Sequence, residues 1–470
     1  MPAHIAGELH AGSARGPGWL HPPEDVNDLV PRLWAASVRR DDDGALRVAG
    51  VDVRDIAREH GTPAYVLDEA DLRARAVAFR DAFSRAFDDS ADVYYAGKAF
   101  LCTAVARWMA EDGLAVDTCS GGELAVALRA GVPPARIGLH GNNKSDAEID
   151  RAVAAGIGRV VVDGLDEIGR VAAAGERHGR RVPVLLRVTV GVEAHTHEYI
   201  ATAHEDQKFG LSLAGGQARK AVELVFEHDR WLDLRGLHSH IGSQIFDTSG
   251  FDVAAHRIIN LHAQLCHELG RELPELDLGG GFGVAYTTQH DPLTPAALAS
   301  GLAEIVNREC SALGVAVPRI SVEPGRAIAA PSTFTLYSVG TVKVVELDGG
   351  LARNYVAVDG GMSDNVRTAL YDADYSCTLA GRASTVPATL SRVVGKHCES
   401  GDIVVKDEYL PGDVRSGDLL AVPGTGAYCR SMASQYNHVP RPPVLSVRDG
   451  EVTVLLRRET EDDLSALDVG

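Results

Sequence analysis

Lys98 is the first residue whose type and surroundings suggest chemistry. It lies in the segment YYAGKAF, between aromatic and small side chains, and these neighbours predict a buried lysine that points inward from the end of a strand. A lysine in such a place can form a Schiff base with an aldehyde cofactor or a carbonyl substrate. The Gly97–Lys98 pair is not a Walker loop, because no Ser or Thr follows it and no glycine stands five residues before Gly97.

Histidines and glycines gather in further short motifs. His238 and His240, in HSHIGSQ, are two residues apart and would lie on the same side of an extended strand. His195 and His197 form a second pair with the same spacing. Three consecutive glycines, 279–281, would let backbone N–H groups approach an anion without obstruction by side chains.

A regular alternation of predicted strands and helices positions these residues. From about residue 69, β-branched runs alternate with Ala-rich stretches whose apolar residues recur every three or four positions, the pattern of helices packed on one face. The predicted strands are 92–96, 115–118, 137–140, 159–163, 182–190, 234–238, 275–278 and 319–322. Eight strand–helix units in roughly 260 residues are typical of a TIM (β/α)8 barrel, with a doubly wound open sheet as the competing architecture.

A second, β-rich domain is predicted after residue 332. Six strand-like runs there, separated by Gly, Pro and Asp, are typical of a mainly antiparallel β-barrel or sandwich. Before the barrel, strands are predicted at 45–51 and 64–67, with a helix between them that ends at Gly61. The predicted organisation is a flexible arm at 1–30, a barrel at 69–332, and a β domain made of 31–68 and 333–470.

The residues at the ends of the predicted strands indicate one kind of ligand. In a TIM barrel the chemistry takes place at the carboxyl ends of the strands, and phosphate binds after strands seven and eight. Glycines 279–281 follow the seventh predicted strand, and the sequence Glu323-Pro324-Gly325-Arg326 follows the eighth. With Lys98 at the end of the first strand, this arrangement indicates a small phosphate-bearing cofactor that reacts with an amine. Pyridoxal 5′-phosphate (PLP) fits that description.

Composition excludes several other classes of protein. The 470 residues include 46 Lys and Arg against 65 Asp and Glu, a formal charge of −19, which would repel the phosphates of a nucleic acid. The seven cysteines are odd in number and form no CxxC pair, which favours the reducing cytoplasm over a disulfide framework. No signal peptide is evident, and no apolar run reaches the roughly 20 residues that span a bilayer. We expect a cytoplasmic protein without nucleic-acid or membrane partners.

Seven segments together resemble the diaminopimelate decarboxylases. In chain order they are YYAGKAF, HSHIGSQ, DLGGGFG, EPGR, DGGMSDNVR, HCESGD and GTGAYC. The resemblance covers nearly the whole chain from about residue 30 to the acidic tail. This family consists of PLP-dependent decarboxylases built like alanine racemase, with a TIM barrel followed by a β domain. The resemblance implies decarboxylation of meso-2,6-diaminopimelate to L-lysine and CO2, the last step of lysine biosynthesis.

The resemblance also implies roles around the cofactor. Lys98 would bind PLP covalently, and His240 would stack on the PLP ring. Glu323 would bond to the pyridine nitrogen and keep it protonated, so that the ring accepts the electrons released when CO2 departs. The segments that the family uses around the phosphate contain Ser243, Gly281, Pro324, Gly325, Arg326 and Tyr428.

For the substrate, the resemblance implies contacts from both predicted domains. The residues concerned are Arg326, Arg367, Tyr371, Glu399 and Tyr428. The distal end of meso-diaminopimelate carries a carboxylate, which suits a guanidinium, and an ammonium, which suits Glu399. Cys398 would donate the proton that replaces CO2. Because Cys398 and Glu399 reach the neighbouring subunit's site in this family, a homodimer with a shared active site is expected.

Four other functions fit the sequence less well than diaminopimelate decarboxylation. Ornithine and arginine decarboxylases share the lysine and EPGR, but their substrates lack a second carboxylate, so Arg367 and Glu399 favour diaminopimelate. Alanine racemase would need a tyrosine base in place of HCESGD, and a non-catalytic PLP-binding barrel would not need the β domain. Metal-dependent hydrolases of the barrel fold place their HxH pair on the first strand, where this chain has Lys98. A zinc hydrolase is the outside alternative, and no metal is expected.

Overall fold

The chain forms two compact units. The computed structural model describes residues 16–191, 208–240, 243–246, 249–347 and 351–470. One unit comprises Arg73–Gly283 and Pro292–Ala327, and the other comprises Met1–Leu72, Val284–Asp291 and Ile328–Gly470. Among the described residues, no helix is both long and apolar enough to cross a membrane.

The first unit is a closed barrel of eight parallel strands. In chain order these are β5 (Ala91–Ala96), β6 (Ala115–Thr118), β7 (Ile137–Leu139), β8 (Arg159–Val162), β9 (Val182–Thr189), β11 (Leu232–His238), β12 (Glu275–Asp277) and β13 (Arg319–Val322). The pairing of β13 with β5 and of β8 with β9 closes the barrel. The short β10 (Leu211–Ser212) pairs with β9 outside this ring. The predicted TIM barrel is therefore confirmed, and the open doubly wound sheet is excluded.

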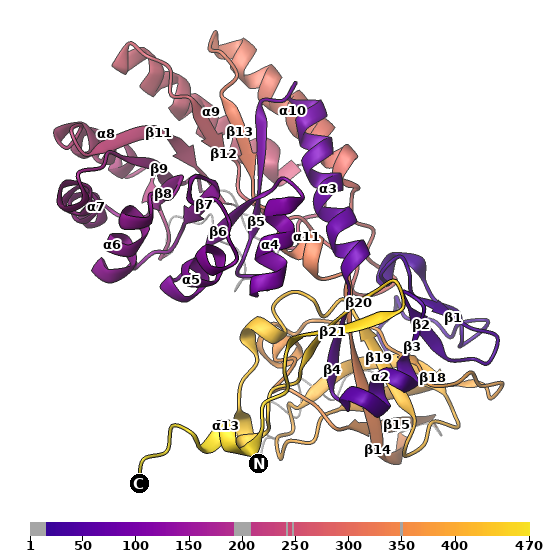
Figure 1. Ribbon diagram of the computed structural model, residues 1–470. Coiled ribbons are helices and arrows are strands. Elements are labelled where there is room, and N and C mark those ends of the chain that lie inside the picture. The colour runs from indigo at the N-terminus through magenta and orange to yellow at the C-terminus, as the bar shows by residue number, and fades with distance from the viewer. Residues whose placement is uncertain (1–15, 192–207, 241–242, 247–248, 348–350) are drawn as a thin grey trace, which may run out of the picture. The chain divides into compact units, whose positions relative to one another are not determined.

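Helices surround the barrel strands (Figure 1). They are α3 (Glu69–Ala86), α4 (Thr103–Glu111), α5 (Gly121–Arg129), α6 (Asp146–Ala155), α7 (Leu165–His178), α8 (Gln217–Glu227), α9 (Ser249–Leu269), α10 (Pro295–Leu313) and the short α11 (Arg326–Ala329). Local sequence signals set several of their ends. Helix α6 begins at a capping box formed by Ser145 and Glu148, and it ends at Gly156, whose φ of 70° is left-handed.

The second unit is built on a mostly antiparallel sheet. Its strands are β4 (Ala64–Asp68), β14 (Thr333–Leu347), β15 (Leu351–Val358), β16 (Thr378–Leu379), β17 (Ala388–Val394), β18 (Ile403–Pro411), β19 (Leu419–Pro423), β20 (Val444–Arg448) and β21 (Glu451–Leu456). The long β14 pairs with β15, β19 and β4, all antiparallel. Among the described strands of this unit, the β15–β17 and β4–β20 pairs alone are parallel. The mainly antiparallel β architecture that the sequence predicts is confirmed. This unit also contains the helices α12 (Arg367–Tyr371) and α13 (Glu461–Ser465).

The predicted single strand at 45–51 is wrong, because a tight turn interrupts it. Strands β2 (Leu46–Val48) and β3 (Val51–Asp52) pair as a hairpin, and β1 (Arg39–Arg40) adds a third strand. Ala49 and Gly50 form the turn with φ values of 46° and 90°. Two successive left-handed residues give the turn twist that matches a tight hairpin.

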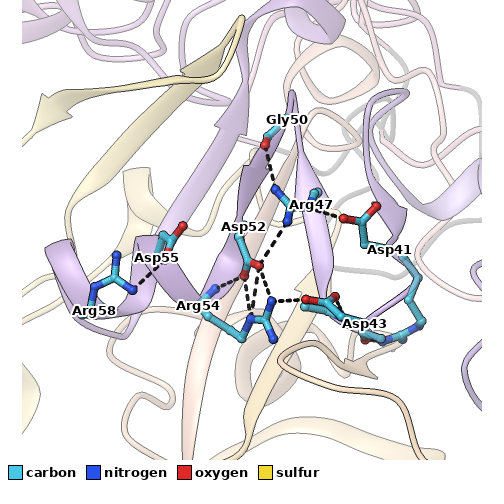
Figure 2. A network of polar contacts seen from close by, with 11 residues as sticks. Asp41, Asp43, Arg47, Gly50, Asp52, Arg54, Asp55 and Arg58 are labelled. Carbon is cyan, nitrogen blue, oxygen red and sulfur yellow. Dashed lines mark hydrogen bonds and ion pairs between the residues drawn. The ribbon is translucent and has the colours of Figure 1, made fainter.

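Helix α2 (Val53–His60) follows this hairpin and ends at Gly61, as predicted. Asp52 caps its N-terminus, because the carboxylate accepts a hydrogen bond from the Arg54 backbone N–H at 2.8 Å. Figure 2 shows the Arg54 guanidinium lying between the carboxylates of Asp52 and Asp43, while Arg47 reaches Asp52 from the other side. Burial acts to raise the pKa of Asp52, but its hydrogen bonds with Arg54 hold that pKa below its usual value.

Candidate active site

Lys98 lies in the turn directly after β5. The preceding Gly97 donates a backbone hydrogen bond to the Asp117 carbonyl at 2.9 Å, and a Cβ at Gly97 would approach that same oxygen to 2.8 Å. The expectation of a buried Lys98 is wrong, because the side chain is exposed where the chain leaves the barrel. Its positive charge nevertheless acts on barrel groups, since it opposes the burial-raised pKa of both Glu323 and Glu123.

Glu323 is part of a buried polar cluster inside the barrel. Its Oε1 accepts a hydrogen bond from His238 Nε2 at 3.0 Å and lies 3.4 Å from His140 Nε2. Burial lowers the pKa of both imidazoles to about 3, so both histidines are neutral near pH 7. Burial also raises the pKa of the Glu323 carboxyl. A neutral His238 that donates to this oxygen stabilises the ionised form of Glu323.

An ion-pair network adjoins this cluster through His140. His140 Nε2 lies 3.1 Å from Asp117 Oδ1, and burial raises the pKa of Asp117 to about 7. Arg159 forms a buried ion pair with Asp277 and lies 3.7 Å from Asp117 Oδ1. The Arg159 guanidinium also stacks 3.6 Å from the centre of the Tyr94 ring. Buried charges inside the barrel are therefore paired across several strands.

His140, Asp117 and Arg159 were not predicted from the sequence to be site residues. A signal was present for two of them, because Asp117 follows two apolar residues in the strand AVDT and Arg159 begins the otherwise apolar strand RVVV. Barrel strands covered on both faces are expected to be apolar, so such residues indicate a polar interior. His140 alone, at the end of an ordinary strand, gave no comparable signal.

His240 packs against the glycine run. Its Nδ1 accepts a hydrogen bond from the Gly280 N–H at 3.2 Å, so a neutral imidazole carries its proton on Nε2. A Cβ at Gly279 would lie 2.9 Å from this Nδ1, and Gly279 and Gly281 have left-handed φ values of 71° and 106°. These positions therefore require glycine.

The sequence predicts that the N–H groups of the glycine run face an anion, but two of the three bond within the protein. The Gly280 N–H bonds to His240, and the Gly279 N–H donates to Asp277 Oδ1 at 2.7 Å. Only the Gly281 N–H has no acceptor among the described residues. Of the three glycines, Gly281 is therefore the one whose backbone suits an anionic ligand.

Arg326 is buried at the start of α11. Its guanidinium donates two hydrogen bonds to Ser243 Oγ, from Nη2 at 2.9 Å and from Nε at 3.2 Å. The preceding Gly325 packs against the end of β5, where a Cβ would approach the Cβ and the carbonyl of Ala96 to 2.9 Å. The Pro324 carbonyl accepts a hydrogen bond from the Ala96 N–H at 3.2 Å. The EPGR segment is thus fixed against the same strand that Lys98 follows.

The second unit buries Arg367 between two tyrosine rings. The guanidinium carbon lies 4.7 Å from the centre of the Tyr286 ring and 5.6 Å from that of Tyr375, and Nη1 donates to the Tyr375 hydroxyl. The residue is 5% exposed, its Nε has no hydrogen-bond partner, and no carboxylate of the described residues pairs with it. Tyr371 lies one turn later in α12, half-buried. Neither Tyr286 nor Tyr375 was predicted from the sequence to be a site residue.

Cys398 and Glu399 are exposed in the turn between β17 and β18. The base of this turn is held by buried His397, whose backbone N–H donates to Asp402 Oδ2 at 2.7 Å and whose Nε2 lies 2.8 Å from Ser363 Oγ. The Cys398 thiol and the Glu399 carboxylate are therefore exposed on a turn whose base is held by hydrogen bonds.

Tyr428 has a strained backbone. Its φ of 62° is left-handed, which is rare for a bulky residue. Such a conformation costs of order 1–3 kcal/mol and clusters at functional sites. This geometry favours a functional position for Tyr428.

The metal alternative rests on histidines in two places. His195 and His197 lie outside the described residues. His140, His238 and Glu323 offer donor atoms within 4.8 Å of one another. A hydrogen bond already joins two of these three groups, His238 and Glu323.

Comparison with known proteins defines the class first. The sequence model of the pyridoxal-dependent decarboxylases, pyridoxal binding domain, matches residues 69–330. The barrel and its polar residues are thus those of a PLP-dependent decarboxylase, a lyase. The residues fit this cofactor, because the Lys98 amine, a histidine-supported Glu323 and the Arg326–Ser243 pair supply partners for an aldehyde, a pyridinium and a phosphate.

Relatives over the full length define the family. The diaminopimelate decarboxylase of Mycobacterium leprae is 52% identical over 100% of both chains, and that of Mycobacterium tuberculosis is 54% identical over 94% of this chain and 98% of its own. A solved diaminopimelate decarboxylase from M. jannaschii, in complex with L-lysine, superposes with a TM-score of 0.85 at 30% identity, over 93% of this chain and 98% of that one. The chain belongs to the diaminopimelate decarboxylases, the PLP-dependent lyases that convert meso-diaminopimelate to L-lysine and CO2.

Proposed function

We propose that this chain binds meso-2,6-diaminopimelate with Arg367 on the distal carboxylate and Glu399 on the distal ammonium, assisted by Arg326, Tyr371 and Tyr428. Arg367 carries this proposal. A buried guanidinium without a carboxylate partner is costly unless an anion completes the site. The distal carboxylate of the substrate is an anion of the right geometry for a guanidinium fork.

The proposal assigns the cofactor to the barrel residues. PLP, when bound, withdraws electrons from the substrate carbon that loses CO2. Lys98 would hold the cofactor covalently, and Glu323 would hold a proton on the pyridine nitrogen, supported by the hydrogen bond from His238. His240 would stack on the ring. Phosphate contacts would come from Ser243, Gly281, Pro324, Gly325, Arg326 and Tyr428.

The proposal also includes a homodimer with a shared active site. Cys398 would supply the proton that replaces CO2, and Glu399 would bind substrate, both in the site of the neighbouring subunit. Their exposure on a turn with a fixed base supports this reach. A cytoplasmic location is also proposed, because the seven cysteines are odd in number and form no CxxC pair.

A substrate panel tests the proposed function. The purified, PLP-loaded protein is incubated with meso-, D,D- and L,L-diaminopimelate and with ornithine, and lysine and CO2 are measured. We expect lysine and CO2 from the meso isomer and no turnover of ornithine, which lacks the distal carboxylate that Arg367 would bind. Turnover of ornithine comparable with that of the meso isomer would overturn the assignment of Arg367.

A further inference from the structure

Two tyrosine rings cover the Arg367 guanidinium, and no carboxylate of the described residues pairs with it. Tyr286 and Tyr375 cover it with their rings, and the two rings meet edge to face with centres 5.0 Å apart and planes at 67°. Burial lowers the pKa of Arg367, whereas Tyr286, Tyr375 and Cys429 raise it. Independently of this shift, the two rings lie close enough to the guanidinium for their negative faces to favour a cation.

A directed chain of hydrogen bonds orients this guanidinium. Arg367 Nη1 donates to the Tyr375 hydroxyl, which lies 3.6 Å from Cys429 Sγ. The Cys429 thiol donates to Asn365 Oδ1 at 3.5 Å, and Asn365 Oδ1 also accepts the Arg367 backbone N–H at 3.3 Å. Because the thiol donates onward, the Tyr375 hydroxyl can donate to sulfur while it accepts from Arg367. This series of hydrogen bonds therefore begins and ends at Arg367.

This arrangement leaves one edge of the guanidinium without a hydrogen-bond partner among the described residues. Nη1 is used by Tyr375, whereas neither Nε nor Nη2 has a hydrogen-bond partner among the described residues. The Nε–Nη2 edge has the two parallel N–H groups that bind a carboxylate in bidentate fashion. Rotation of the guanidinium would move this edge and break the bond to Tyr375.

We propose that Tyr375 and Tyr286 are positioning residues for substrate selection. Tyr375 fixes the rotation of the Arg367 guanidinium, and Tyr286 stabilises its charge, so that the Nε–Nη2 edge is presented to the distal carboxylate of the substrate. This inference rests on the proposed carboxylate-binding role of Arg367. It adds two residues that act through Arg367.

The test uses two ligands that differ by one carboxylate. L-Lysine, the product, keeps the distal carboxylate, and cadaverine (1,5-diaminopentane) is lysine without it. Dissociation constants of both ligands for the PLP-loaded protein are measured by calorimetry for the parent, Tyr375→Phe, Tyr286→Leu and Arg367→Ala. Tyr65→Phe is the matched control, because it removes another buried hydroxyl of the same unit, one that bonds to the Asp364 carbonyl.

We expect Tyr375→Phe and Tyr286→Leu to weaken lysine binding roughly tenfold, with cadaverine binding and the absorbance of bound PLP unchanged. Tyr65→Phe should bind both ligands like the parent. In one contrary outcome, both tyrosine variants keep the parental ratio of the lysine and cadaverine dissociation constants while Arg367→Ala loses it. That result would overturn the positioning role alone. An unchanged ratio in Arg367→Ala would instead overturn the proposed function of Arg367. Equal weakening of both ligands in the tyrosine variants would show a general structural effect and would also count against positioning.

Discussion

Two lysines follow barrel strands, and their surroundings give them different chemistry. Lys144 is 3% exposed, and its Nζ contacts Glu167 Oε1 at 2.6 Å and donates to the carbonyls of Val161 and Gly141 at 2.6 and 2.8 Å. These three short contacts hold the Lys144 amine among protein groups and away from any other carbonyl compound. Lys98 is exposed after β5, so of these two amines it is the one that can reach an aldehyde.

The first prediction follows from this contrast. Lys98→Ala should abolish turnover and the visible absorbance of covalently bound PLP, and borohydride reduction should then trap no PLP on the protein. Mass spectrometry of peptides from the reduced parent and variant provides the measurement. A PLP adduct on Lys144 in the variant would contradict the assignment. Lys144→Met is unsuitable as a control, because it would leave the buried carboxylate of Glu167 without its cation.

A second prediction concerns Arg367. Arg367→Ala should lower kcat/KM for meso-diaminopimelate roughly 30- to several-thousand-fold, which corresponds to about 2–5 kcal/mol of lost transition-state stabilisation. The reason is that the substitution removes one partner of a desolvated, charge-assisted pair between Arg367 and the distal carboxylate. The absorbance of bound PLP should persist. Arg367→Lys should recover little, because an ammonium cannot form the planar two-bond fork. Tyr371→Phe, which deletes a single hydroxyl, should lose less. Parental kinetics in Arg367→Ala would mean that the substrate specificity depends on Arg326 and Glu399 instead.

Sequence predicted individual residues best where a motif coincided with a strand end. Glu323 and His240 fall in that category, and the structure places both in close polar contact with other barrel residues. The surroundings of Arg367 were not predictable in the same way. Tyr286 follows a barrel strand in the chain but belongs to the second unit, and Tyr375 lies beyond α12. Nothing local in the sequence indicates that these two rings meet around one guanidinium.

At the scale of elements, periodicity predicted strands well and turns poorly. All eight barrel strands were predicted within about two residues of their observed bounds. Strand β20 was missed, and the run at 45–51 was read as one strand. In its Ala49–Gly50 turn, Gly50 is a residue type that indicates a left-handed conformation. Ala49, whose φ is 46°, is not such a residue type. Short hairpins without Asn or Asp at the turn are therefore difficult to recognise from sequence.

The N-cap of α2 gives a prediction at this scale. Asp52→Ala removes the acceptor for the Arg54 N–H and should destabilise the second unit by about 1 kcal/mol, a fall in Tm of roughly 2–4 °C by calorimetry. Asp43→Ala is the matched control. It removes another carboxylate that pairs with Arg54, but Asp43 is 48% exposed and caps no helix, so its effect should stay below about 0.5 kcal/mol.

The effect of Asp52→Ala should depend on pH. The fold holds the pKa of Asp52 below its usual value. The stabilisation is therefore complete above the unfolded-state pKa of about 3.9 and is lost as the pH falls through the lower folded-state pKa. The Tm difference between parent and variant should be constant near pH 7 and should shrink at acidic pH. A difference that grows on acidification would contradict the capping role.

At the scale of the whole molecule, the net charge opposes the binding of the cofactor's phosphate. A protein with a charge of −19 repels a phosphate dianion over long distances. A bound phosphate then needs local positive groups, and the guanidinium of Arg326, which is 7% exposed, would be such a group. Composition could predict this requirement but not its solution, because burial depends on how distant segments of the chain pack.

The last prediction addresses the assembly. If Cys398 acts in the neighbouring subunit's site, then Lys98→Ala and Cys398→Ala chains, each inactive alone, should form heterodimers in which one site holds both an intact Lys98 and an intact Cys398. Mixing equal amounts under conditions of subunit exchange should place about half of the chains in heterodimers, with one complete site in each, so activity should approach about one quarter of the parental value. The control mixes Lys98→Ala with Lys98→Arg chains, which restore no site in any combination. Exchange is followed by native mass spectrometry of chains that differ in isotope label. Demonstrated exchange without recovery of activity would show that each subunit carries its own complete site, and Cys398 would then have to act within the chain that provides Lys98.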